Sequence, residues 1–141
     1  MKRHGFTLIE LIIVLAIISI GYGVTVFNFT IIDKIGAKNE IQTFVDDYSY
    51  LRDLSLSTSF KNYIEFNSNG YTISGVSNKS RNLKYIKALN TSKITFAENA
   101  YVSTDKTSDA YNLVFVSKKD SNIRWYFTIE AVGGYLSEKN K

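Results

Sequence analysis

The sequence predicts an α+β protein: one long N-terminal α-helix packed on an antiparallel β-sheet head. Three observations lead to this fold class. An uncharged apolar run lies near the N-terminus, an amphipathic helical segment follows it directly, and short alternating segments separated by turn signals fill the rest. The length of 141 residues suits one domain plus a tail, and without cysteine the core must hold without disulfides.

The first part of the predicted helix is the apolar run. No formal charge occurs in the 22 residues from Leu11 to Ile32. About 20 apolar residues cross a bilayer as a helix, and Lys2 and Arg3 before the run place the N-terminus in the cytoplasm. No small-residue cleavage site follows the run, so we expect it to stay with the protein. We therefore predict a membrane-crossing helix within residues 6–32.

The helix is predicted to continue as an amphipathic segment that ends near Ser57. Apolar side chains recur at the spacing of one helical face, at Ile41, Phe44, Val45, Tyr48 and Leu51. Arg52 lies at the edge of this stripe, where its long stem covers apolar surface. Asp46 and Asp47 are predicted to be solvated, because adjacent helical residues point about 100° apart and make a poor acid/base pair.

After the helix the pattern changes to strands that complete a head over residues 33–141. The pair Asn69-Gly70 between two alternating runs is a strong hairpin signal. Ser77–Arg81 and Thr104–Ser108 are predicted to be loops. The predicted strands are Asn62–Asn67, Tyr71–Val76, Lys93–Ala97, Ala110–Lys118, Arg124–Val132 and a short Tyr135–Leu136.

Glu10 is the unusual residue of the apolar segment, because it places a carboxylate at the front of the run. A carboxylate near the centre of a membrane helix costs roughly 2.5–3.5 kcal/mol on insertion scales, so such a residue usually has a partner or a function. The alternative is an interfacial side chain that merely reaches the lipid head groups. Composition alone leaves both interpretations open.

The residues around Glu10 resemble the class III signal of type IV prepilins: basic residues, then Gly5, Phe6, Thr7-Leu-Ile-Glu10 and a long aliphatic run. The resemblance implies a leader of residues 1–5 that is cut after Gly5, and Phe6 as the new, N-methylated terminus. It also implies that Glu10 sets the register of assembly by meeting the terminal amine of a neighbouring subunit. In a low-dielectric helix bundle such a pair is favoured over either charge alone.

The resemblance further implies the pilin fold and a structural role, without enzymatic activity or cofactor. The implied partners are a prepilin peptidase, other pilin subunits, an assembly platform protein and its cytoplasmic ATPase. The implied location is first the cytoplasmic (inner) membrane, as a single-pass protein, and then a pilus or pseudopilus at the cell surface. A looser resemblance is to H-type minor pseudopilins of type II secretion and D-type competence pseudopilins. It is carried by the helical segment Tyr48-Ser49-Tyr50-Leu51-Arg52 followed by a hairpin ending in Gly70-Tyr71-Thr72-Ile73, and by the late strand that runs into Gly133-Gly134.

Two glycines interrupt the apolar helix, Gly21 and Gly23. One interpretation is close packing between helices, because small residues let backbones approach. The other is a soft point at which the helix bends or melts during assembly, although a glycine costs only about 1 kcal/mol in a helix. Many pilins carry a proline in this region, whereas this chain has none, and Gly36 offers a second soft point.

Basic residues next to aromatic ones suggest a second function, DNA capture by a minor pilin of a transformation pilus. Lys118, Lys119 and Arg124, together with Trp125 and Tyr126, would form a basic and aromatic surface. The plainer alternative is a charged hairpin turn beside core aromatics.

A third hypothesis is a monomeric membrane-anchored protein, for example an enzyme, whose N-terminus only mimics a pilin. Nothing in the sequence points to a metal site, since the single histidine, His4, lies in the predicted leader and cysteine is absent.

Overall fold

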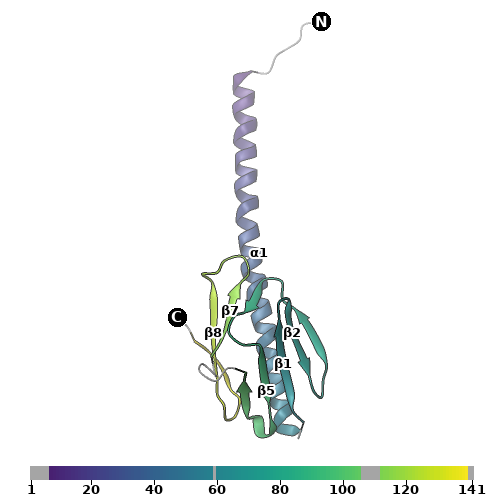
Figure 1. The fold of residues 1–141 in the computed structure, drawn as a ribbon. Helices are drawn as coiled ribbons and strands as arrows, with labels where there is room; N and C mark the ends of the chain where they lie inside the picture. Colours follow the sequence, from purple (N-terminus) through teal and green to yellow (C-terminus); the bar gives the residue numbers. More distant parts are fainter. Residues whose placement is uncertain (1–6, 59, 106–111, 140–141) are drawn as a thin grey trace. The chain divides into compact units, whose positions relative to one another are not determined.

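The computed structural model describes residues 7–58, 60–105 and 112–139, and of residues 23–30 it describes the backbone only. The chain divides into two compact units, Met1–Ile35 and Gly36–Lys141, which are treated separately below. The helix α1 (Leu8–Ser57) supplies the described part of the first unit and the first element of the second (Figure 1). The predicted end of the helix at Ser57 is confirmed. Its predicted start at Phe6 lies outside the described residues.

The first unit is an apolar helix. From residue 8 to residue 22 its large apolar side chains are all exposed in the isolated chain: Leu8, Ile9, Leu11, Ile12, Ile13, Val14, Leu15, Ile17, Ile18, Ile20 and Tyr22. Among the residues described with their side chains, no helix combines the length and the apolar character that a membrane crossing requires.

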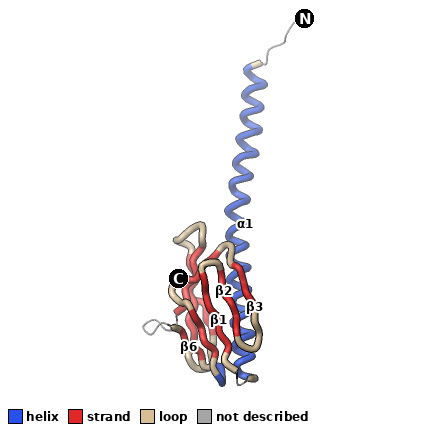
Figure 2. The backbone as a smooth tube through the Cα atoms, turned by 45° about the vertical axis from the view of Figure 1, so that its right-hand side comes forward, coloured by secondary structure: helices blue, strands red, loops and turns tan. Residues whose placement is uncertain are grey.

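The second unit contains the rest of α1 and two antiparallel sheets, whereas one sheet was predicted. Sheet A has the strand order β3-β2-β1-β5-β6 and sheet B the order β4-β7-β8-β9 (Figures 1 and 2). The strands are β1 (Asn62–Asn67), β2 (Gly70–Ser74), β3 (Lys79–Asn82), β4 (Ile86–Ala88), β5 (Lys93–Phe96), β6 (Val102–Thr104), β7 (Asn112–Ser117), β8 (Arg124–Ile129) and β9 (Leu136–Lys139), with a 3₁₀ turn η1 (Glu98–Ala100) between β5 and β6. The α+β class and the pilin-type arrangement of a long helix on antiparallel strands are confirmed.

The hairpin of β1 and β2 matches the prediction. Its two strands pair from Asn67 opposite Gly70 to Tyr63 opposite Ser74. Glycine is required at the first residue of β2, because a Cβ on Gly70 would lie 1.9 Å from the carbonyl oxygen of Arg81 on β3.

Three strands were not predicted. β3 occupies most of the segment that was predicted to be a loop, and β4 and β6 are three-residue strands. β3 has no buried residue and its sequence, Lys-Ser-Arg-Asn, shows no apolar alternation, so periodicity cannot reveal it. It forms as an edge strand by pairing with β2.

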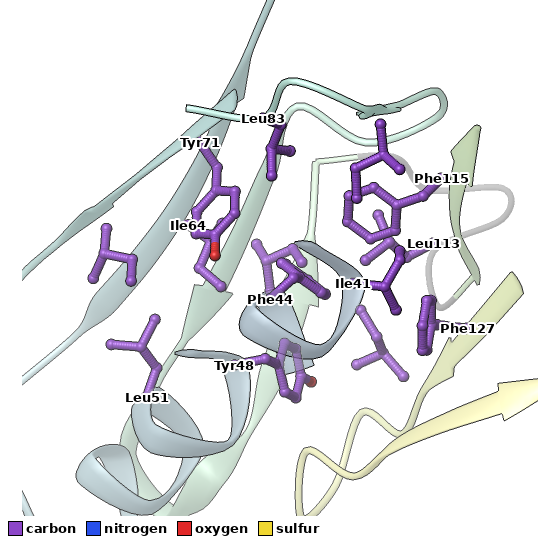
Figure 3. Close-up of a cluster of buried hydrophobic side chains, with 14 of the residues drawn as sticks. Ile41, Phe44, Tyr48, Leu51, Ile64, Tyr71, Leu83, Leu113, Phe115 and Phe127 are labelled. Carbon is purple, nitrogen blue, oxygen red and sulfur yellow. The ribbon is translucent and has the colours of Figure 1, made fainter. Parts of the chain in front are cut away.

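The core of the second unit joins α1 to both sheets. Four of the five residues on the predicted helical stripe, Ile41, Phe44, Tyr48 and Leu51, are buried, and Val45 is partly buried against them. The ring of Phe44 lies 5.6 Å from that of Tyr71 in sheet A and 4.8 Å from that of Phe115 in sheet B, measured between centroids (Figure 3). One helical side chain therefore contacts both sheets.

The turn after β8 is fixed against α1 through Arg52. Gly133 and Gly134 have φ of 82° and 60°, a left-handed conformation that favours glycine. Arg52 donates a hydrogen bond from Nε to the carbonyl oxygen of Gly133 at 2.6 Å, and its guanidinium lies 4.0 Å from the ring centroid of Tyr135. The predicted edge position of Arg52, with its stem over apolar surface, fits this contact.

Candidate functional site

The described start of α1 is closed by a reciprocal cap between Thr7 and Glu10. The Glu10 carboxylate accepts hydrogen bonds from the backbone N–H of Thr7 at 2.8 Å and from the Thr7 hydroxyl at 2.9 Å, both at Oε2. In return the Thr7 hydroxyl accepts a weaker bond from the backbone N–H of Glu10 at 3.4 Å. This is a capping box, which satisfies helix N–H groups that have no intrahelical partner.

The capping box gives Glu10 a role that the sequence analysis missed. The signal was present, because Thr7-Leu-Ile-Glu10 directly before an apolar run is the S/T-x-x-E pattern of a helix start. An ionised carboxylate has about four acceptor positions, so two bonds at Oε2 leave room for a cation at Oε1. The cap and a contact with a neighbouring subunit are therefore compatible.

The structure describes only some of the other residues that the sequence analysis singled out near the N-terminus. Gly5, Phe6 and His4 lie outside the described residues. Gly21 lies in α1, and apart from its chain neighbours and the backbone of its own helix, no described atom lies within 4 Å of a Cβ placed on it. Gly23 lies in the part of α1 whose side-chain surroundings are not described. Packing and softening at these two glycines both remain predictions.

Comparison with known families supports the motif. Residues 1–24 match the family model described as the prokaryotic N-terminal methylation motif. The chain is type IV prepilin-like. The match covers the predicted leader, the predicted cleavage bond, Glu10 and the first part of the apolar run, and it ends before the head. No significant match is found to a curated protein or to a solved structure.

Asp47 of this prepilin-like chain is buried, so its predicted solvation is wrong. The exposed fraction of Asp47 is 8%, and its carboxylate meets three side chains of sheet A. Arg81 binds both oxygens, through Nε at 2.8 Å and a terminal nitrogen at 3.1 Å, while the Tyr71 hydroxyl donates at 2.8 Å and the Lys79 ammonium at 3.3 Å. The neighbouring Asp46 is exposed, as predicted, and accepts a bond from Gln42.

The contacts of Asp47 determine its charge state. Burial raises the pKa of the Asp47 carboxyl, but hydrogen bonds from Arg81, Tyr71 and Lys79 and the charge of Arg81 outweigh burial and hold the pKa below its usual value. For Tyr71, burial and the adjacent Asp47 both raise the phenol pKa. Asp47 is therefore an ionised anchor between α1 and the edge of sheet A, and its geometry indicates a structural role.

A second carboxylate of α1, Glu40, anchors the connection between the two sheets. It accepts hydrogen bonds from the backbone N–H groups of Lys84, Tyr85 and Ile86, at 2.6, 2.9 and 3.1 Å. One turn earlier on the helix, a Cβ on Gly36 would lie 2.4 Å from the Tyr85 ring. Gly36 therefore provides the space in which this ring packs, which gives the predicted soft point a packing role.

The predicted DNA-contacting residues lie together on the hairpin of β7 and β8. Lys118 donates from its ammonium to the carbonyl oxygen of Leu83 at 2.5 Å, and Arg124 donates from Nε to the carbonyl oxygen of Ser121 at 3.1 Å. Lys119 is exposed, and Trp125 is partly buried against the core. A partly buried indole is a poor platform for base stacking, which favours the charged-hairpin interpretation.

Proposed function

We propose that this chain is a minor pilin or pseudopilin, a structural and non-enzymatic subunit of a filament. In this proposal it begins as a single-pass protein of the cytoplasmic membrane with its N-terminus in the cytoplasm. A prepilin peptidase cuts after Gly5, Phe6 becomes the methylated terminus, and the helix then enters a pilus or a secretion or competence pseudopilus. Sister pilins, a platform protein and its ATPase are the proposed partners.

The observation that carries the proposal is the N-terminal methylation motif joined to a helical stretch, residues 8–22, whose large apolar side chains are all exposed in the isolated chain. Residues 1–24 match the motif, and the large apolar residues of 8–22 are exposed. Such a surface is unfavourable in water and indicates a lipid or protein environment. An apolar helix that leaves the membrane needs sister helices around it, and assembly into a filament supplies them.

Processing at Gly5 is the first test of the proposal. Gly5→Leu places a bulky side chain at the scissile bond, so we expect the precursor to accumulate uncut in cells that express a prepilin peptidase. Intact-mass spectrometry of the membrane fraction separates the precursor from a mature chain that begins at methylated Phe6.

The matched control is Gly21→Leu, which adds the same side chain to a helical glycine where, apart from its chain neighbours and the backbone of its own helix, no described atom would lie within 4 Å of the new Cβ. We expect this variant to be cut normally. If Gly5→Leu is also cut at the wild-type rate, processing at this bond is contradicted.

A further inference from the structure

Exposed basic side chains gather at one end of the unit Gly36–Lys141. We call this surface the basic end and define it by six residues: Lys38, Lys84, Lys87, Lys118, Lys119 and Arg124. Contacts within the unit join their segments. The ring of Tyr85 packs at Gly36, and the carbonyl oxygen of Tyr85 accepts a hydrogen bond from the backbone N–H of Lys118 at 2.8 Å.

In sheet B, Lys87 and Arg124 lie at the same register position on two different strands. Val116 of β7 pairs with Lys87 of β4 on one side and with Arg124 of β8 on the other. Lys119 lies in the turn that joins β7 to β8. The basic end is therefore a set of neighbouring loops and strand ends around the point where α1 enters this unit.

Acidic residues compensate little of this charge. Glu40 lies at this end, but its carboxylate already accepts three backbone N–H groups. Asp120 lies in the hairpin turn and accepts a hydrogen bond from the backbone N–H of Asn122. Among the described residues of this unit, the basic end has six exposed cations and two carboxylates, so its surface is positive.

The covalent chain keeps Gly36, the first residue of this unit, close to the apolar run. The uncharged run ends at Ile32, four residues before Gly36. Four residues span at most about 14 Å even when fully extended. This limit applies to the distance between the Cα atoms of Ile32 and Gly36. If the apolar run crosses the bilayer, Gly36 stays near the depth of the lipid head groups, and the Tyr85 segment that packs on Gly36 stays close to it.

We propose that the basic end binds anionic phospholipid head groups while the chain is anchored in the membrane before assembly; this inference rests on the membrane anchoring of the proposed function. Anionic lipids attract clustered Lys and Arg, and each such residue near the surface contributes roughly a fivefold preference for the bound state. The short connection from Ile32 to Gly36 ties this unit to the proposed membrane anchor, which favours lipid over DNA as the partner. The partly buried Trp125 also offers no stacking platform for bases. Docking of this kind holds the head against the membrane until assembly draws the subunit out.

The test uses the full chain and its single tryptophan, Trp125, which follows Arg124 on β8. The chain is reconstituted into vesicles of phosphatidylcholine, alone or mixed equally with phosphatidylglycerol, each with a trace of dansyl-labelled phosphatidylethanolamine. Flotation reports anchoring, and energy transfer from Trp125 to the dansyl groups reports docking of the basic end. We expect flotation with both vesicles and stronger transfer with phosphatidylglycerol. Raising the salt from about 0.1 M to about 1 M should remove the difference, because the Debye length falls from about 10 Å to about 3 Å.

Variants that each remove lysine charge, inside or outside the basic end, test whether docking depends on the basic end. Lys87→Gln should lower the ratio of docked to undocked head roughly fivefold, and Lys84→Gln with Lys87→Gln roughly 25-fold. Lys61→Gln removes the same charge beside the first residue of β1, away from the basic end, and should leave the ratio unchanged. An equal effect of Lys61→Gln and Lys87→Gln would overturn the proposal.

The remaining outcomes separate this proposal from the one on which it rests. Flotation with both vesicles but equal energy transfer overturns lipid docking and leaves the membrane anchor standing. No flotation with either vesicle overturns the anchor, and lipid docking with it. If a short DNA duplex at equal phosphate concentration abolishes the transfer, nucleic acid is the preferred occupant and lipid docking is overturned.

Discussion

At the residue scale, the Glu10 carboxylate has two roles, one observed in the structure and one proposed for the filament. Its Oε2 accepts both hydrogen bonds from Thr7, and among the described residues no bond to Oε1 is found. The first demand is local, because the cap satisfies N–H groups at the helix start. The second is the proposed contact with the terminal amine of a neighbouring subunit, which needs the negative charge. Substitutions at Glu10 and Thr7 separate the two.

Glu10→Gln tests the charge while keeping the cap, because glutamine serves equally in a capping box. Removing one partner of a buried ion pair costs about 3–5 kcal/mol, so we expect filament yield to fall below detection. Thr7→Ala is the counterpart: it weakens the cap by about 1 kcal/mol but keeps the carboxylate, and filaments should still form. The measurement is the yield of sheared fibres, with sister subunits present. Normal yield from Glu10→Gln would exclude a charge-dependent register.

At the scale of elements, sequence patterns predicted what is local and regular. The helical stripe around Phe44 and the hairpin of β1 and β2 follow from periodicity and turn chemistry. Three-residue strands such as β4 and β6 are too short to show alternation. The motif from Gly5 to Glu10 was predictable because its residues are adjacent. The partners of Asp47 lie 24 to 34 residues away in the chain, so neither its burial nor the edge strand β3 could be predicted.

The ion pairs between Asp47 of α1 and two residues of β3, Lys79 and Arg81, predict how the free energy of unfolding changes at acidic pH. Asp47→Asn replaces the carboxylate that holds Arg81 and Lys79, so we expect the free energy of unfolding to fall by about 2 kcal/mol at neutral pH. Because the native pKa of Asp47 is lowered, its stabilisation is fully present above the unfolded value of about 3.9. It is lost as the pH falls through the native pKa.

Urea denaturation of wild type and Asp47→Asn across this pH range measures the effect. The difference between the two proteins should stay constant down to about pH 4 and then shrink as the acid is strengthened. Tyr71→Phe serves as the control, because it removes one hydrogen bond to Asp47 and leaves the charge. If the difference in free energy of unfolding between wild type and Asp47→Asn persists at the most acidic pH, the difference comes from packing and not from the ionised carboxylate.

At the scale of the whole molecule, the unit Gly36–Lys141 depends on one shared core. The chain has no cysteine, so no disulfide can hold the two sheets together. Instead, α1 contributes aromatic side chains to both: Phe44 reaches Tyr71 and Phe115, and Tyr48 packs at 4.9 Å on Phe96. Separate polar anchors, Asp47 for sheet A and Glu40 for the segment before sheet B, then fix the helix against the strands. We therefore expect the two sheets to unfold as one cooperative unit.

Phe44→Ala tests that expectation, because it removes the ring that contacts both sheets. Truncating a buried phenylalanine costs about 3–5 kcal/mol, and Phe44→Leu, which keeps most of the volume, should cost much less. Urea denaturation of the full chain in detergent is followed in sheet B by Trp125 fluorescence and in sheet A by hydrogen exchange at β1 and β2. Both probes should shift to lower urea together. Loss of sheet A protection while Trp125 keeps its native signal would mean that each sheet has its own stability, and that the helix does not couple them.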